Sequence, residues 1–244
     1  LVLVAAVAAC APAATQPLPQ PGPALQPPAQ RVLPYPVELP PSFQQAVQNG
    51  TRTLTGHPGP RYWQNQASYR LRATLHPDEN RLDGAAEIVY RNNSPDTLGN
   101  LHVDLAQNFH APGAIRFEEA EVTGGVELRR VAVNGVALGV DGEGPRYAVF
   151  GTRLVILPPQ PVAPGQSVTI AVDWGLPIPQ AGAGERMGYG DGLFFLAYWY
   201  PHMTVYDDIV GWHPDPFVGT TEFYHGFARY ELTVDAPAGW VVMG

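Results

Sequence analysis

Residues 67–76, which read ASYRLRATLH, decide the fold class of this chain. The apolar side chains of this segment alternate with polar ones. They are Tyr69, Leu71, Ala73 and Leu75. Because successive side chains of a strand point to opposite faces, this alternation predicts a half-buried β-strand. A polar turn follows at residues 76–80, and residues 82–90 alternate again, which predicts a second strand.

Outward from these two strands, short apolar segments recur between clusters of turn residues. They predict further strands at residues 101–105, 147–157, 167–174, 193–200 and 230–234. Asn134-Gly135 is a strong hairpin signal and predicts two paired strands within residues 131–138. Only residues 42–54 are predicted to form a short helix or turn. The fold class that follows is all-β, an antiparallel β-sandwich, with a barrel as the alternative.

The start of the chain has the features of an export signal. Residues 1–9 read LVLVAAVAA, an apolar run that is too short to span a bilayer and is typical of a partial signal peptide. Val7-Ala8-Ala9-Cys10 resembles a bacterial lipobox, so Cys10, the one cysteine, is the expected lipid attachment site. The alternative is an ordinary signal peptide in which Cys10 is incidental. We expect an exported protein on the periplasmic or cell-surface face, anchored in a membrane that is most simply the outer membrane.

A proline-rich segment follows Cys10. Residues 11–41 are dominated by Pro, Gln and Ala, which disfavours helices and strands and favours extended polyproline II. The predicted organisation is therefore a signal remnant at residues 1–9, a lipid-anchored disordered linker at residues 10–58 and a β-sandwich domain at residues 59–244.

Charge excludes one class of partner. The 244 residues hold 14 basic and 22 acidic side chains, a net charge of -8, and no run of basic residues. Nucleic-acid binding requires a basic stripe that neutralises phosphates, so we expect no nucleic-acid partner.

No catalytic, cofactor or metal residue is assigned from the sequence. None of the seven histidines precedes a glutamate, so the zinc motif HExxH is absent. Glu222 and His225 have a ligand spacing that works on a helix, but the surrounding aromatic run and Gly226 favour a loop or the start of a strand there. His202 and His213 flank Asp207-Asp208, and a polar loop with hydrogen-bonded histidines is the favoured interpretation.

Residues 193–230 are unusually rich in aromatic side chains. Two interpretations stay open at this point. The segment could form a platform that binds peptide or carbohydrate, or its rings could fill the core of the sandwich. Composition favours the core.

Several pieces of this segment occur in the order of a known signature. They are Trp199-Tyr200-Pro201, Val205-Tyr206-Asp207, Gly211-Trp212-His213-Pro214 and Glu222-Phe223-Tyr224. Tyr62-Trp63-Gln64-Asn65 and the closing strands that begin at Tyr230 agree with the same signature. In these pieces the chain resembles the N-terminal domain of bacterial gluzincin aminopeptidases, the family typified by aminopeptidase N. The resemblance runs from about residue 62 to residue 244.

This resemblance implies a saddle-shaped, mostly antiparallel β-domain packed against a zinc catalytic domain. The zinc, its HExxH ligands and the general base would belong to that catalytic domain in cis, and the parent would remove amino-terminal residues from peptides. The chain is thus expected to be an inactive fragment of a zinc aminopeptidase, in which Trp199, Tyr200 and Tyr206 would border the cleft. Residues 194–197 read FFLA, so the Gln or Glu that the family uses near the substrate amino group does not carry over.

Two other hypotheses remain. The chain could be a stand-alone lipoprotein whose β-sandwich binds peptide or glycan, or a degenerate partner of an intact peptidase.

Overall fold

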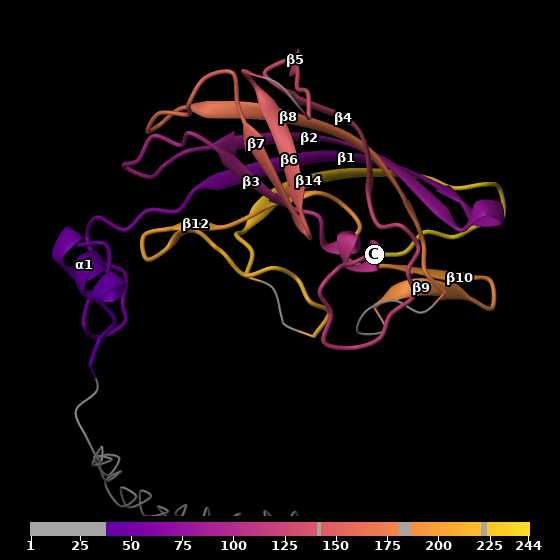
Figure 1. The fold of residues 1–244 in the computed structure, drawn as a ribbon, viewed down its shortest axis with the longest axis horizontal. Helices are drawn as coiled ribbons and strands as arrows, with labels where there is room; N and C mark the ends of the chain where they lie inside the picture. Colours follow the sequence, from indigo (N-terminus) through magenta and orange to yellow (C-terminus); the bar gives the residue numbers. More distant parts are fainter. Residues whose placement is uncertain (1–37, 141–142, 181–185, 221–223) are drawn as a thin grey trace, which may run out of the picture. The chain divides into compact units, whose positions relative to one another are not determined.

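The computed structural model describes residues 38–140, 143–180, 186–220 and 224–244. The strands all lie in one compact unit, residues 39–244 (Figure 1). Cys10 and the predicted signal peptide lie outside the described residues. Within the described ranges, no helix is long and apolar enough to cross a bilayer.

The larger of the two main sheets has six strands in the order β14-β1-β2-β8-β4-β5. Their bounds are β1 Gln66–His76, β2 Arg81–Arg91, β4 Glu127–Val133, β5 Val136–Ala137, β8 Ser167–Pro177 and β14 Ala228–Asp235. β1 and β2 pair antiparallel along their whole length across the short 3-10 helix η1 (Pro77–Glu79). Buried and exposed side chains alternate along both strands, so the prediction from the two alternating segments is confirmed.

One edge of this sheet differs from a purely antiparallel arrangement. β14 pairs with β1 in parallel, with Ala228 opposite Ala67 and Leu232 opposite Leu71. Parallel neighbours require a long connection, and here most of the chain lies between the two strands. The sheet is therefore antiparallel throughout except for this edge pair.

The smaller sheet has four strands in the order β11-β3-β7-β6. Their bounds are β3 Leu101–Asp104, β6 Arg146–Phe150, β7 Arg153–Leu157 and β11 His202–Met203. The single strand predicted at residues 147–157 is two strands, β6 and β7. Gly151 has a φ of +57°, a left-handed conformation that turns the chain and lets the two halves pair as a hairpin.

The two sheets enclose one hydrophobic core. In Figure 1 the long strands β1, β2 and β8 lie alongside one another, and β3, β6 and β7 cross them. A single cluster of buried side chains joins both sheets, among them Leu82, Ile88, Leu101, Ile156 and Trp174. The all-β sandwich predicted from the sequence is confirmed.

Two small hairpins and a second 3-10 helix complete the strand-rich part. They are β9 Met187–Gly190 with β10 Leu193–Leu196, β12 Tyr206–Asp207 with β13 Gly211–Trp212, and η2 Ala106–His110. β9 includes Gly188 and Gly190 of a glycine-rich part of the sequence. The strand predicted at residues 193–200 ends at Leu196, and Tyr198 beyond it has a φ of +55°.

The helix α1 (Pro41–Asn49) confirms the short helix predicted after the proline-rich segment. It begins with proline in its first turn and ends at Gly50, whose φ of +77° caps the last carbonyls. The linker was expected to extend to residue 58, yet the compact unit already begins at Leu39. Residues 39–58 therefore belong to the same unit as the sheets.

Candidate functional site

A cavity of about 380 Å³ lies where three segments distant in the sequence come together. It is lined by residues 62–67 before and at the start of β1, residues 202–207 and residues 224–227, with Tyr69 and Tyr90 from the larger sheet. Ten of these positions are aromatic or amide side chains. We call it the aromatic cavity.

One wall of the aromatic cavity belongs to a continuous row of rings. Trp63 stacks on Tyr206, with ring centroids 5.9 Å apart and planes 28° apart. Tyr206 meets Trp212 edge to face at 5.1 Å, and Trp212 lies 6.0 Å from Tyr90. The Tyr206 hydroxyl donates to an Asp96 carboxylate oxygen at 2.9 Å. The hairpin β12–β13 thus places Tyr206 between a loop tryptophan and the sheet.

Another part of the lining belongs to a cluster of stacked tyrosine and histidine rings. Tyr69 stacks on Tyr230, at 4.8 Å, and on His202, at 5.4 Å, and His202 stacks on His225 at 3.9 Å. His202 Nδ1 lies 2.8 Å from the Met203 carbonyl, so Nδ1 carries the proton and donates. Its Nε2, at 3.2 Å, then accepts from the Tyr230 hydroxyl. This pattern fixes His202 in one neutral tautomer.

Burial keeps the histidines of this region neutral. It lowers the pKa of His202 to about 4, an effect that the neighbouring His225 increases. Burial likewise lowers the pKa of His102 to about 4, with a further contribution from Arg153. The pKa of His225 is lowered by burial too, although Asp104 opposes this. These imidazoles are therefore hydrogen-bonding and stacking groups near neutral pH, not cations.

A second cavity, of about 510 Å³, adjoins a half-buried ion pair. Arg153 Nε donates to Asp104 Oδ1 at 2.7 Å, and the Thr204 hydroxyl donates to the same oxygen at 3.0 Å. Burial raises the pKa of Asp104, while Arg153 and Thr204 counteract it. Arg153 also donates to the carbonyls of His213 and Asp215, at 2.8 and 3.2 Å, so this one guanidinium ties the chain after β13 to the smaller sheet.

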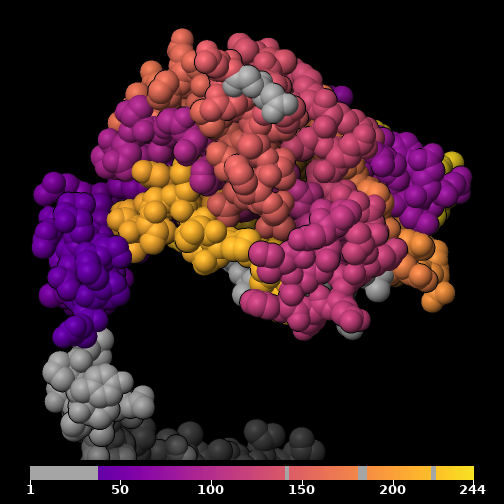
Figure 2. Space-filling view, viewed as in Figure 1, coloured from indigo at the N-terminus to yellow at the C-terminus, as the bar shows by residue number. Residues whose placement is uncertain are grey.

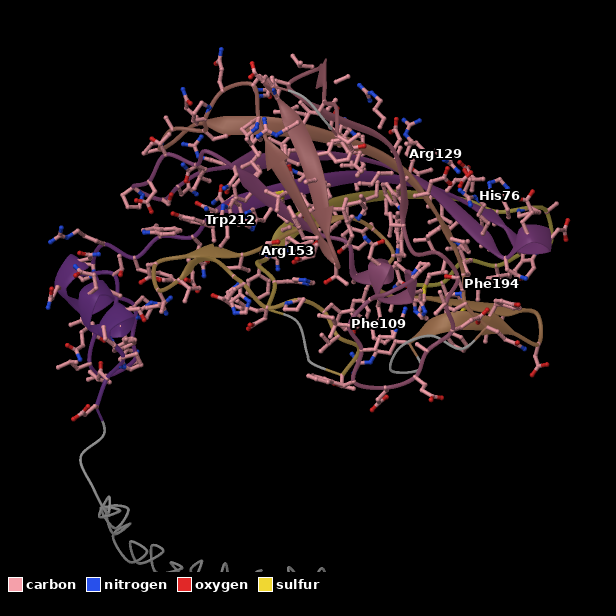
Figure 3. All side chains as sticks on the ribbon, in the orientation of Figure 1. His76, Phe109, Arg129, Arg153, Phe194 and Trp212 are labelled. Atoms are coloured by element: carbon pink, nitrogen blue, oxygen red, sulfur yellow. The ribbon has the colours of Figure 1, made fainter. Side chains whose placement is uncertain are left out.

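The side chains around this ion pair can be followed in the figures. Figure 3 labels Trp212 and Arg153. His102 links the two: its ring stacks on Trp212 with centroids 5.0 Å apart, and its Nδ1 lies 3.4 Å from Arg153 Nη1. In Figure 2 the gold residues around 200–220 lie next to the magenta segment 105–125. The two segments meet at the second cavity, where Ile115 and Phe117 face Phe217 and Val218.

The three residues expected to border a cleft are not equivalent. Tyr206 lines the aromatic cavity, whereas Trp199 and Tyr200 are outside its lining. Trp199 packs against the core and accepts a hydrogen bond from the Trp174 indole through its carbonyl at 3.2 Å. Tyr200 packs against the core as well, and its hydroxyl donates to that of Tyr230 at 3.3 Å.

The polar residues weighed as ligands have structural roles. Asp207 accepts the backbone N–H groups of Ile209 and Val210 at 2.9 Å, which closes the β12–β13 turn. Asp208 pairs with Arg52 at 2.6 Å. Glu222 lies outside the described residues, so its pairing with His225 is untested. Among the described residues no group of three or more His, Cys, Asp or Glu side chains is arranged to hold a metal ion.

Sequence reasoning did not assign to a site two groups of residues that the structure places at the cavities. They are residues 62–67 and the pair Asp104–Arg153. Trp63 and Asn65 carry only a family resemblance in the sequence, and nothing in the sequence marks Asp104, the last residue of β3, as part of a site. The available signal was a loop with two adjacent large aromatics, Tyr62 and Trp63, just before the first strand. Large rings at such a position indicate contact with another segment.

Comparisons with known proteins give structural neighbours only. No protein-family model and no curated protein matches the chain. An M1 zinc metallopeptidase mutant from Deinococcus radiodurans is similar at 15% identity and a TM-score of 0.43, over 75% of this chain and 34% of that chain. The M1 zinc metallopeptidase from the same organism aligns at 15% identity and a TM-score of 0.33, over 50% and 22%. A mutant of that enzyme bound to a Tyr-Ser-Ala substrate aligns at 14% identity and a TM-score of 0.32. This alignment covers 47% of this chain and 21% of that chain. The chain thus spans no more than 34% of the length of these metallopeptidases.

Proposed function

We propose that this chain is the non-catalytic N-terminal domain of an exported zinc aminopeptidase that removes amino-terminal residues from peptides. The ordered signature between residues 62 and 244, which resembles gluzincin aminopeptidases, supports the family. The all-β sandwich is the fold which that resemblance implies. The observation that carries the proposal is an apolar surface left uncovered near the end of the chain.

This uncovered surface, the C-terminal apolar surface, consists of large side chains in and after the last strand. They are Phe227 just before β14, Tyr230 and Leu232 within it, and Val241, Val242 and Met243 after it, and each of these side chains is exposed. Leu232 is 53% exposed although it lies opposite Leu71, which is 2% exposed on the core face of β1. The inner face of β14 therefore extends past the core that covers β1. Exposed apolar surface of this kind marks a site where another domain or protein packs.

The proposed occupant of this surface is the catalytic domain of the same protein. Zinc bound there would activate a water molecule for peptide hydrolysis. Among the described residues no group of His, Cys, Asp or Glu side chains is arranged to hold this zinc, and in the proposal the chain contributes the packing surface.

The experiment compares this chain with a longer product that includes the reading frame after residue 244. We expect the chain alone to lack stoichiometric zinc and to leave aminoacyl p-nitroanilides intact, and the longer product to contain one zinc and hydrolyse them. Absence of an in-frame HExxH, or stoichiometric zinc in the chain alone, would overturn the proposal.

We further propose that Cys10 is lipidated and holds the domain at the outer membrane behind its proline-rich tether. The lipobox-like residues 7–10 support this. Each buried methylene of an acyl chain contributes about 0.8 kcal/mol, so more than one chain is needed for a stable anchor. In the precursor as encoded, Cys10→Ser should move the protein from the membrane to the soluble fraction and abolish palmitate labelling. Unchanged fractionation and labelling would contradict lipidation.

A further inference from the structure

We propose that the aromatic cavity binds an extended, proline-rich peptide segment. The inference is independent of the peptidase assignment, because it concerns a recognition site within the described β-domain. It rests on three features of the cavity: its ring surfaces, its unpaired donors and the hydrogen bonds of its other polar groups.

The ring surfaces suit a ligand that is apolar and rigid. Trp63 and Tyr206, stacked on one another, both line the cavity, and Tyr62 and Tyr224 line it beside them. Proline rings dock in aromatic-lined grooves, and a polyproline II segment is already extended before binding, so little entropy is lost. A cavity of about 380 Å³ accommodates a few residues of such a segment.

Two donors remain available at these rings. In the described part of the chain, neither the Trp63 indole N–H nor the Tyr224 hydroxyl has a hydrogen-bond partner. Tyr224 is 48% exposed, so its hydroxyl is accessible. A polyproline II backbone has no internal hydrogen bonds, and its carbonyl oxygens accept from side chains of this kind.

Several other polar groups of the cavity, among them Asn65, Thr204 and Asp207, are already engaged, which disfavours a sugar. The Asn65 amide donates to the Tyr90 hydroxyl at 2.7 Å, while its oxygen accepts two backbone N–H groups. Thr204 donates to Asp104, and Asp207 accepts from its own turn. A carbohydrate would need several convergent polar groups for its hydroxyls. The cavity instead offers ring surfaces and isolated donors.

The chain itself includes a sequence of this ligand class. Residues 16–28 read QPLPQPGPALQPP, and eleven of the 27 prolines of the chain lie in residues 11–41. Copies concentrated on one membrane would therefore present proline-rich segments to one another. A synthetic peptide with the sequence of residues 16–28 is the natural probe.

The test is a fluorescence-anisotropy titration of this labelled peptide with the full chain. We expect saturable binding that Trp63→Ala weakens about tenfold or more, as for a buried aromatic anchor. Tyr224→Phe keeps the ring and removes the hydroxyl, and should weaken binding about 3- to 10-fold. Phe195→Ala removes an aromatic that is 53% exposed outside the cavity and should change nothing.

Three results would overturn the proposal. They are no saturation up to about 1 mM peptide, an affinity of Trp63→Ala and of Tyr224→Phe that equals that of the unaltered chain, and binding of chitohexaose without binding of the peptide. Far-ultraviolet circular dichroism of each variant distinguishes lost binding from lost folding, and Tyr224→Phe, at an exposed position, keeps the test valid if Trp63→Ala does not fold. Failure here leaves the peptidase proposal intact, since that depends on zinc and the following reading frame.

Discussion

Trp174 is fully buried and lies across the backbone of Gly84 on the neighbouring strand. A Cβ added at Gly84 would overlap the indole ring, so the glycine is required by this contact and not by a turn. The indole N–H in turn donates to the Trp199 carbonyl, which joins the strand pair to the segment after β10.

Gly84→Ala should destabilise the domain by about 1–3 kcal/mol, because the core must shift to accept one methyl group. Urea unfolding followed by tryptophan fluorescence measures this. Gly99→Ala is the matched control, since a Cβ there meets no atom within 4 Å. Equal midpoints for the two variants would show that the Gly84 contact is not tight.

The buried histidines make stability depend on pH. His202 has a pKa of about 4 in the folded chain and about 6.5 when unfolded. Between these values the unfolded chain binds more protons, so stability rises with pH and is lost as pH falls from about 6.5 to about 4. The contribution of His202 is on the order of 3 kcal/mol. Burial raises the pKa of Asp104, so protonation of this carboxyl favours the folded chain. At the acidic end of the range Asp104 therefore partly offsets the loss of stability that His202 causes.

We expect the urea midpoint to fall steadily between about pH 7 and pH 5. His202→Phe retains a ring for the stack and removes the titrating group. It should lower stability at neutral pH, through the lost bonds to Met203 and Tyr230, and flatten the pH dependence. A slope as steep as that of the unaltered chain would assign the effect to other groups.

At the scale of elements, α1 is held by one carboxylate. Asp208 accepts from the Thr51 hydroxyl and pairs with Arg52, the two residues just after the helix. Burial alone would raise the pKa of Asp208, but these hydrogen bonds hold it below its usual value. A nine-residue helix with one buried side chain is marginal in isolation, so its position depends on this contact.

Asp208→Ala should therefore loosen α1 more than it weakens the sheets. We expect a loss of about 2–3 kcal/mol in the local opening of residues 41–52, measured by amide hydrogen exchange. Glu87→Ala breaks an ion pair with Arg70 whose side chains are 51% and 54% exposed, and should cost less than about 1 kcal/mol. If both variants exchange alike, the Asp208 contact is not what holds the helix.

At the scale of the whole molecule, the C-terminal apolar surface should make the isolated chain self-associate. Replacing Leu232 and Val242 together by Ser removes apolar area and should shift sedimentation toward monomer. Phe150→Ser, at a side chain that is 66% exposed on β6, is the control and should have little effect. A chain that is monomeric at all concentrations, with or without the substitutions, would contradict an uncovered interface.

Much of the strand content was predictable because it is local. The alternation in residues 67–76 and 82–90 sets which face is buried, and Asn134 and Gly135, with φ of 49° and 81°, form the expected hairpin turn. Predictions were wrong where a single residue turns the chain, as Gly151 does between β6 and β7. The sequence pattern of one long apolar strand does not differ from that of two shorter strands joined by a tight turn.

The sequence by itself determined the all-β class, a short helix or turn within residues 42–54, the position of the hairpin at Asn134-Gly135 and the residues of the family signature. Only the tertiary structure decided that β14 lies parallel to β1, that Tyr206 lines a cavity while Trp199 packs on the core, and that Trp63 faces Tyr206. Strand periodicity is local and can be read from neighbouring residues. The aromatic cavity joins segments more than 130 positions apart, and such contacts form only when the whole core is assembled.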